Sequence, residues 1–327
     1  MVDSDAALPS AGVIASAPAK IVLFGEYASI YGQPSIGVAL EHLTICKAAP
    51  GRKRFHTVNH HKINQYRDTY IKKAVEKYWK GGSLDFSTDS NLPSASGVGS
   101  SASITAATMG ALLGLENGFS EEECGIRSHT IECLVEKRVA SPIDTATVTH
   151  GSGVLVSGTE GDGLLWKTEF KGRTWYVHGL DIPEITFVLG WSGSKAKTPL
   201  QVKKVMNFKK RQKDFYMDIM KDMGKLALEG MAALKDQDMA AMGKLMDRNH
   251  RLMAILGINT PALQAMVDAV KPHAYGAKVT GAGGGGCMVA MTKEPEEASM
   301  AIKRIGGTPI IARSIKQGVK VERLPGK

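Results

Sequence analysis

The spacing of apolar and polar positions changes along the chain, and these changes predict the order of its elements. Residues 13–49 contain the apolar and β-branched runs KIVLF and HLTIC on either side of the turn YGQPS, which predicts two or three strands. Residues 64–79 carry apolar positions at helical spacing and stop before Gly81 and Gly82, as a helix with a glycine cap would. The next segment, LDFSTDS at 84–90, predicts a strand.

Two helices and then a strand meander are predicted next. Residues 101–115 are rich in Ala and Leu, and residues 120–137 begin at Ser120, whose third successor is Glu123. That spacing is a capping box and marks the start of a helix. Short apolar runs then predict four strands, in residues 151–158, 163–170, 173–180 and 184–193.

Residues 199–270 are helical in pattern, and a stripe of methionines runs through them. Such a stripe can form an adaptable binding groove, but core filling in a helical bundle is its commoner cause, so we predict core. From Tyr275 the pattern returns to strand, loop, strand, helix and strand. The methionines concerned are Met206, Met217, Met220, Met223, Met231, Met239, Met242, Met246 and Met253.

This order of elements predicts an α+β fold with two lobes. The expected organisation is a flexible tail over residues 1–12, a first domain over 13–185 and a second domain over 186–327. Composition agrees with a globular protein, because 43% of the 327 residues are hydrophobic and 22% are charged.

The net charge limits the classes of binding partner, and the cysteines bear on the cellular location. The net charge of +9 favours an anionic partner such as nucleic acid, a membrane surface or a phosphorylated small molecule. The basic segments RKRFHTVNHHK and NFKKRQKDF are interpreted as solvated surface, so no nucleic-acid or membrane partner is expected. The four cysteines show no metal-ligand spacing, no apolar run reaches eighteen residues, and the first residues are acidic. These features predict a cytoplasmic protein.

A glycine- and serine-rich loop, LPSASGVGSSA at residues 92–102, lies between a predicted strand and a predicted helix. Backbone N–H groups at such a helix start point one way and attract anions, and the helix dipole adds to the attraction. Gly97 and Gly99 allow the backbone to approach an anion closely, while Ser100 and Ser101 provide hydroxyls that can reach phosphate oxygens or Mg²⁺. A plain flexible loop is the alternative. The chain has neither a Walker loop nor a Rossmann fingerprint.

A second glycine cluster and two carboxylates complete the candidate chemistry. Five glycines fall within residues 281–286, more than a hairpin turn requires. Asp144 follows Ser-Pro-Ile and is either a helix cap or a base, and Glu132 lies on the helix that leads to it. Lys20 and Glu26 are six residues apart, so in a straight strand they share one face.

Four stretches in this order and spacing resemble the GHMP kinases, and among them most closely the archaeal-type mevalonate kinases. The stretches are APAKIVLFGEYASIYG, LPSASGVGSSA, ASPIDTATVTHGSG and KVTGAGGGGCMVAM. The resemblance covers residues 13–323 and implies a two-lobed fold, with an N-terminal lobe like domain 2 of ribosomal protein S5 and a ferredoxin-like C-terminal lobe. It further implies that ATP and Mg²⁺ are used to phosphorylate the 5-hydroxyl of mevalonate.

The resemblance also assigns roles to individual residues. Asp144 would be the catalytic carboxylate and Lys20 its cationic partner, which keeps it ionised. Ser101 and Glu132 would hold Mg²⁺, although Glu132 lies twelve residues before Asp144 where eleven are expected, so a one-residue insertion must be assumed. The phosphate-binding residues would be Pro93, Ser94, Ala95, Ser96, Gly97, Val98, Gly99, Ser100, Ser101 and Ala102. The substrate-binding residues would be Lys20, Glu26, Tyr27, Asp144, Thr145, Lys197, Thr198, Gly281, Ala282, Gly283 and Gly284.

The acceptor alcohol is less well defined by the sequence. Mevalonate kinases usually have Gly-Glu-His after the first lysine, and here Tyr27 takes the place of the histidine. A tyrosine donates a hydrogen bond but carries no positive charge. Mevalonate, mevalonate 3-phosphate and another small alcohol therefore all stay open, as does an inactive ATP-binding regulator. The sequence leaves the oligomeric state open between a monomer and a homodimer.

Overall fold

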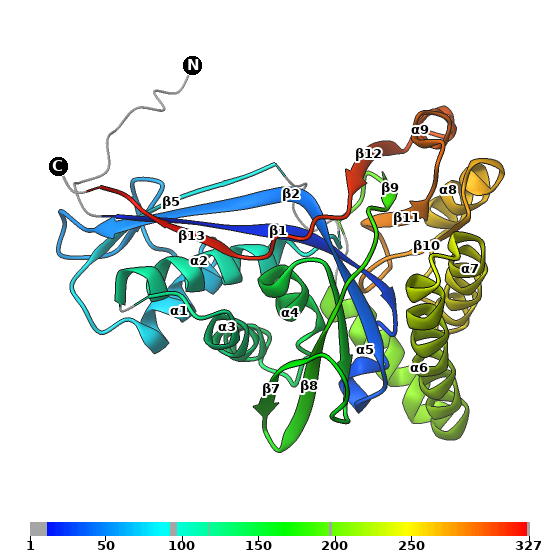
Figure 1. Ribbon diagram of the computed structural model, residues 1–327, viewed down its shortest axis with the longest axis horizontal. Coiled ribbons are helices and arrows are strands. Elements are labelled where there is room, and N and C mark those ends of the chain that lie inside the picture. The colour runs from blue at the N-terminus through cyan, green and yellow to red at the C-terminus, as the bar shows by residue number, and fades with distance from the viewer. Residues whose placement is uncertain (1–11, 92–96, 117, 196–197, 326–327) are drawn as a thin grey trace.

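The computed structural model describes residues 12–91, 97–116, 118–195 and 198–325. These residues form two lobes. A long sheet with helices beneath it occupies the left of Figure 1, and a smaller sheet with its own helices occupies the right. The mixed content of strands and helices confirms the predicted α+β class.

Within the described residues, the first lobe holds one sheet of nine strands. The central strand is β2, which pairs with β1 on one edge and with β5 and β6 on the other. Strand β13 pairs with the far edge of β1, so the C-terminal segment returns from the second lobe to the first. The strands are β1 (Val13–Phe24), β2 (Ser35–Pro50), β3 (Thr57–Val58), β4 (His61–Lys62), β5 (Leu84–Ser90), β6 (Gly153–Ser157), β7 (Leu164–Phe170), β8 (Arg173–Leu180) and β13 (Lys320–Arg323).

Four helices of this lobe are α1 (Thr69–Tyr78), α2 (Ser100–Glu116), α3 (Glu121–Glu136) and α4 (Ile143–His150). Helix α2 lies on β1 and β2, and it is buried on nearly every side because α1, α3 and α4 pack around it. Its glycines make the close packing possible, since a Cβ at Gly110 would lie 2.8 Å from Val319. Near the start of this helix, Ser103 donates its hydroxyl hydrogen to the carbonyl of Pro18 at 2.7 Å, which ties this end of α2 to β1.

The second lobe contains a sheet of four strands in the order β10-β11-β9-β12 among the described residues. This antiparallel order, with helices between β9 and β10 and between β11 and β12, is ferredoxin-like and agrees with the expectation. The elements are β9 (Thr186–Trp191), α5 (Thr198–Arg211), α6 (Lys213–Lys235), α7 (Met239–Ile255), α8 (Pro261–Val270), β10 (Gly276–Val279), β11 (Cys287–Met291), α9 (Pro295–Arg304) and β12 (Thr308–Arg313).

Several local predictions are confirmed. Ser120 caps α3 by accepting a hydrogen bond from the backbone N–H of Glu123. The methionine stripe is core, since Met220, Met223 and Met246 are buried. The second sheet begins at Thr186, and β13, which follows it in sequence, belongs to the first sheet, so the division into domains at 185/186 stays a prediction.

One local prediction was wrong in its start. The helix expected over 64–79 begins at Thr69, because the Asn64 side chain accepts hydrogen bonds from the backbone N–H groups of Tyr66 and Arg67 and forms a turn. The stretch IDTATVTH, for which no element was predicted, forms helix α4. Its β-branched residues favour strands, and burial against α3 and β1 outweighs that preference.

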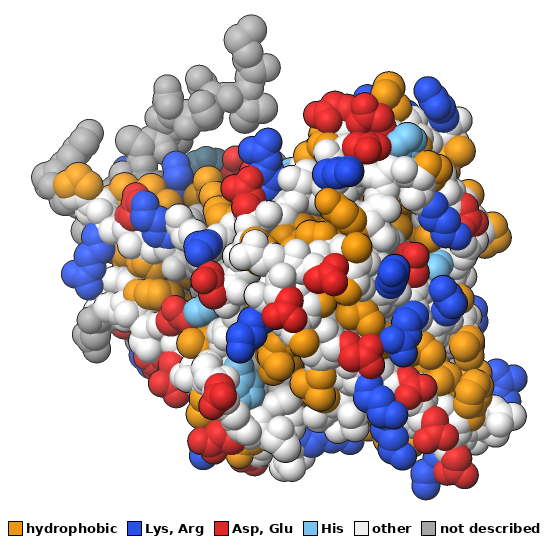
Figure 2. All heavy atoms as spheres, turned by 45° about the vertical axis from the view of Figure 1, so that its right-hand side comes forward, with side chains coloured by type: hydrophobic (Ala, Val, Ile, Leu, Met, Phe, Trp, Pro, Cys, Tyr) orange, Lys and Arg blue, Asp and Glu red, His pale blue; other side chains and the backbone are white. Residues whose placement is uncertain are grey.

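The surface of the second lobe mixes charges of both signs. Figure 2 shows Lys and Arg side chains interspersed with Asp and Glu over this face. Ion pairs account for part of this pattern, such as Arg248 with Glu229 at 2.9 Å. On this face the net positive charge is not gathered into one patch. None of the described helices is long and apolar enough to cross a membrane.

Candidate active site

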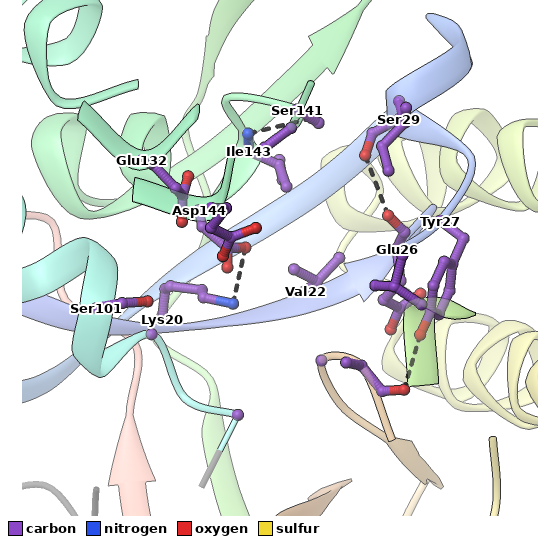
Figure 3. Close-up of a pocket in the computed structure, with 18 of the residues that line it drawn as sticks. Lys20, Val22, Glu26, Tyr27, Ser29, Ser101, Glu132, Ser141, Ile143 and Asp144 are labelled. Atoms are coloured by element: carbon purple, nitrogen blue, oxygen red, sulfur yellow. Dashed lines mark hydrogen bonds and ion pairs between the residues drawn. The ribbon is translucent and has the colours of Figure 1, made fainter. Parts of the chain in front are cut away.

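A pocket of about 740 Å³ opens where the two lobes meet. Its walls come from the end of β1, the start of α2, the end of α3, the start of α4 and the loop between β10 and β11. Figure 3 shows Lys20, Ser101, Glu132 and Asp144 at one end and Glu26 with Tyr27 at the other. The first and second glycine clusters of the sequence therefore face one cavity.

The loop before α2 forms an amide-rich turn on the pocket wall. Gly97 and Gly99 have φ angles of 85° and 89°, which only glycine adopts at low cost. The backbone N–H of Lys20 donates to the carbonyl of Val98 at 3.0 Å, which ties the loop to β1. Ser100 and Ser101 begin α2 and line the pocket, so the positive end of the helix dipole lies at the cavity. The predicted residues Pro93, Ser94, Ala95 and Ser96 lie outside the described residues, whereas Val98 and Ala102 are buried behind the loop.

The second glycine loop packs against the first. A Cβ at Gly281 would lie 3.2 Å from the carbonyl oxygen of Gly97, so neither loop can carry a larger residue there without moving the other loop. Gly281 and Ala282 line the pocket. Gly283 and Gly284 do not, because they face Ile258 and Gln201. The two loops thus form a continuous wall, to which only part of the predicted glycine set contributes.

Lys20 and Asp144 form an ion pair of 2.8 Å between Nζ and Oδ1. Lys20 comes from β1 and is 2% exposed, whereas Asp144 comes from the first turn of α4 and is 32% exposed on the pocket side. Asp144 is not the cap of α4, because the N-cap position is Pro142 and Asp144 lies within the first turn. The structure therefore leaves the Asp144 carboxylate free to act in the cavity.

Glu132 adds a second carboxylate beside this pair. It is 5% exposed, it lines the pocket, and its Oε2 has no hydrogen-bond partner among the described residues. Burial raises the pKa of Glu132 well above its ordinary value, and the negative charges of Asp144 and Glu136 raise it further. Carboxylates crowded in this way are favourable hosts for a cation. The assumed one-residue insertion therefore does not remove Glu132 from the site.

Glu26 and Tyr27 reach the other end of the pocket. Strand β1 ends at Phe24 and Gly25 turns the chain at φ 87°, so the condition of a straight strand from Lys20 to Glu26 is not met. Both residues still line the cavity. Tyr27 donates its hydroxyl hydrogen to the carbonyl of Ala282 at 2.8 Å, which joins β1 to the second glycine loop.

Three other predicted residues are not brought to the cavity by anything the structure describes. Thr145 is fully buried and donates to the carbonyl of Pro142 at 3.2 Å, so its hydroxyl does not line the pocket. Lys197 lies outside the described residues, and of Thr198 only the backbone, at the start of α5, is described. Val202 shows that α5 does reach the cavity.

Sequence reasoning missed several residues of the site. Lys278 on β10 is fully buried, pairs with Glu26 and donates to the carbonyl of Val22 at 3.1 Å. The only feature of the sequence that could have identified Lys278 is its position as a single lysine in the apolar run before the second glycine loop. Tyr70, Glu136 and Arg138 also line the pocket and carried no recognisable motif.

A buried histidine supports the turn that leads to Asp144. His129 on α3 is within hydrogen-bond distance of the Ala140 carbonyl, at 3.0 Å from Nε2, and of Thr168 Oγ1, at 2.9 Å from Nδ1. Burial lowers the pKa of His129 to about 4. The neutral imidazole is therefore the form that the fold accommodates.

This histidine makes stability depend on pH in a defined window. Because its pKa is lower in the folded chain than the ordinary 6.5, its contribution is complete above pH 6.5 and is lost as the pH falls towards 4. The loss is about 3 kcal/mol. His129→Gln is expected to flatten this part of the profile, measured by urea unfolding at pH 7 and pH 4.5. Exposed His61→Gln is the control, and equal slopes in both variants would contradict the assignment.

An amide-rich turn at a helix start, beside a lysine–carboxylate pair at the same end of one cavity, is the arrangement of a phosphotransferase site. Family comparisons agree. Residues 69–152 match the GHMP kinases N terminal domain model, and residues 231–308 match the GHMP kinases C terminal model.

Relatives match over almost the whole chain. The mevalonate kinase of Thermococcus sibiricus is 34% identical, covering 95% of this chain and 98% of the relative. That of Pyrococcus furiosus is 31% identical and covers 95% and 99%. The chain belongs to the GHMP kinase family. A solved mevalonate kinase of L. major, in complex with R-mevalonate, shares the fold with a TM-score of 0.74 at 20% identity, covering 93% of this chain and 96% of that one.

Proposed function

We propose that this chain transfers the γ-phosphoryl group of ATP to the 5-hydroxyl of mevalonate, giving 5-phosphomevalonate and ADP. The curated full-length relatives support the substrate. The single observation that carries the reaction type is the 2.8 Å pair of Lys20 and Asp144, which lies beside the glycine turn in one cavity.

The chemistry follows from the weakness of an alcohol as a nucleophile. Asp144 accepts the proton of the hydroxyl as its oxygen attacks the γ-phosphorus, and the bond to the bridging oxygen breaks, so that ADP leaves with the electron pair. Lys20 offsets the negative charge that gathers around the transferred group. The backbone amides near Gly99 hold the phosphates in place.

Mg²⁺ fits the residues present. The unpaired Oε2 of Glu132 is buried in the pocket that Ser101 also lines, and the carboxylates Glu132, Glu136 and Asp144 outnumber the cations Lys20 and Arg138 that line the pocket with them. The described residues contain no group of three or more His, Cys, Asp or Glu side chains arranged to hold a metal by themselves. That suits Mg²⁺, which is bound through one or two carboxylates together with substrate phosphates. Held by Glu132 and Ser101, it would neutralise phosphate charge.

A coupled ADP-release assay tests the proposal. Purified protein is given ATP and Mg²⁺ with mevalonate, mevalonate 3-phosphate, phosphomevalonate, homoserine or galactose. We expect turnover with mevalonate that EDTA abolishes and added Mg²⁺ restores. Mevalonate 3-phosphate belongs in the panel because Tyr27, which replaces the usual histidine, uses its hydroxyl on Ala282. Robust turnover on a sugar or amino acid alone would defeat the proposal, and ATP binding without turnover would indicate a regulator.

Two further expectations accompany this function. A cytoplasmic location and a possible assembly into homodimers stay predictions, because neither follows from the fold or the site.

A further inference from the structure

Arg138 stands in the pocket without an assigned role. It follows Lys137, whose φ of 55° ends α3 and reverses the chain. Through this turn Glu136 and Arg138 both line the cavity and pair with each other. The Arg138 side chain is 33% exposed. Arginine carries five N–H donors in a fixed fork, and Glu136 is the one partner that Arg138 has among the described residues.

The cations available to an anionic acceptor can be counted from the described pocket wall. Two positive side chains line it, Lys20 and Arg138. Lys20 is committed to Asp144. Lys278 lies behind the wall, where it is fully buried and held by Glu26 and by the Val22 carbonyl. Lys20 also acts on the transferred group, so Arg138, with five N–H donors and Glu136 as its ion-pair partner, is the cation of the described wall that is left for the acceptor.

Arg138 lines the same pocket as Glu26 and Tyr27, which lie at its acceptor end. Burial raises the pKa of Tyr27, and the positive charge of Arg138 opposes that rise, as it also does for Tyr70 and Glu132. At that end the Tyr27 hydroxyl is used on Ala282, and the Glu26 carboxylate is paired with Lys278 and accepts a hydrogen bond from Asn249, so neither side chain offers a positive charge to an acid. An acceptor carboxylate placed there needs a positive partner, which the tyrosine does not supply.

We propose that Arg138 binds the carboxylate of the acceptor alcohol and so selects an anionic substrate. This inference rests on the proposed function. In this proposal Arg138 pairs with the acceptor's charge, which a histidine at position 27 would otherwise do. The group that Arg138 recognises is a carboxylate. The guanidinium group of an arginine can donate two parallel, charge-assisted hydrogen bonds to a carboxylate, whereas a lysine acts as a single point charge.

The test compares native protein with Arg138→Met and Arg138→Lys in the ADP-release assay. Arg138→Met is expected to raise KM for mevalonate by about 10- to 100-fold and to change KM for ATP by less than about 3-fold. Arg138→Lys is expected to fall between the two. An uncharged analogue, 3-methylpentane-1,3,5-triol, replaces the carboxylate by a hydroxymethyl group. Native protein should discriminate strongly against it, and Arg138→Met should lose most of that discrimination.

Two controls separate this role from simple charge balance. Arg248→Met removes an arginine that pairs with a glutamate outside the pocket, and its kinetics should match the native protein. The double variant Glu136→Gln/Arg138→Met restores the charge balance of the pair. If Arg138 only neutralised Glu136, this variant would recover the native KM for mevalonate. Under the proposal it keeps the raised KM.

Each outcome decides the matter. A raised KM for ATP with an unchanged KM for mevalonate would make Arg138 a phosphate contact and overturn the inference, as would unchanged values for both. Failure of native protein to turn over mevalonate is a different result, since it would refute the proposed function before any variant is compared.

Discussion

The Asp144→Asn variant is expected to lose about 10²- to 10⁴-fold in kcat, with KM for ATP changed by less than about 3-fold. An amide has the size of the carboxylate and still accepts a hydrogen bond from Lys20, so the 2.8 Å contact and the fold are retained. It does not take up the proton of the attacking hydroxyl. The measurement is the ADP-release rate at saturating ATP and acceptor.

Asp181→Asn provides the matched control. Asp181 pairs with Lys316 at 3.0 Å on the surface, so this variant makes the same chemical change in an ion pair away from the pocket. Its kcat should equal that of the native protein. An Asp144→Asn variant with native kcat would remove the base from the mechanism, and a large rise in KM for ATP at constant kcat would make Asp144 a binding residue.

The sequence was a good guide to the fold wherever period and composition agreed. The capped helix at Ser120 and the methionine-filled bundle of the second lobe were predicted correctly, because local signals and burial favour the same structure there. Helix α4 was missed because its threonines and valine prefer extended backbone. Its stability comes from burial against elements distant in sequence, which a local pattern does not contain.

The site was predictable where its chemistry needs an unusual residue type. Gly97 and Gly99 stood out because a positive φ requires glycine, and both line the pocket. Arg138 was not predictable, since a single arginine near a helix end is ordinary. Lys278 and Glu26 form a pair that is 252 residues apart in sequence, so the burial of both becomes visible only when the lobes are placed together.

The position of Tyr27 illustrates the same limit. Its place after Gly25 and Glu26 pointed to the acceptor, and the structure does put it on the pocket wall. Its hydroxyl, however, donates to Ala282 in the second glycine loop. The position of Tyr27 in the motif therefore indicated which part of the pocket it lines. Its hydrogen-bond partner could not be predicted, because that contact joins segments 255 residues apart.

Lys20→Met is expected to lower kcat by about 10²- to 10³-fold, since a buried, positioned positive charge near the transferred group is lost. Methionine fits the narrow, apolar path of a side chain that is 2% exposed, so the variant should fold. Lys20→Arg should not restore the rate, because the lysine stem fills the space beside Gly99. A Cβ at Gly99 would lie 2.7 Å from Lys20 Cγ. Both rates are measured as ADP release under saturating conditions.

The Gly99→Ala variant tests whether the rate depends on the position of the Lys20 ammonium group and not only on its charge. The added methyl group would push against the Lys20 stem and strain a backbone held at φ 89°, so the ammonium group moves while the charge remains. A displacement of this kind is expected to cost about 10- to 100-fold in kcat. Lys316→Met, which removes an exposed ion-paired lysine, should leave kcat unchanged. If Lys20→Met kept native turnover while Asp144→Asn lost it, the lysine would serve only to hold β1 against α4.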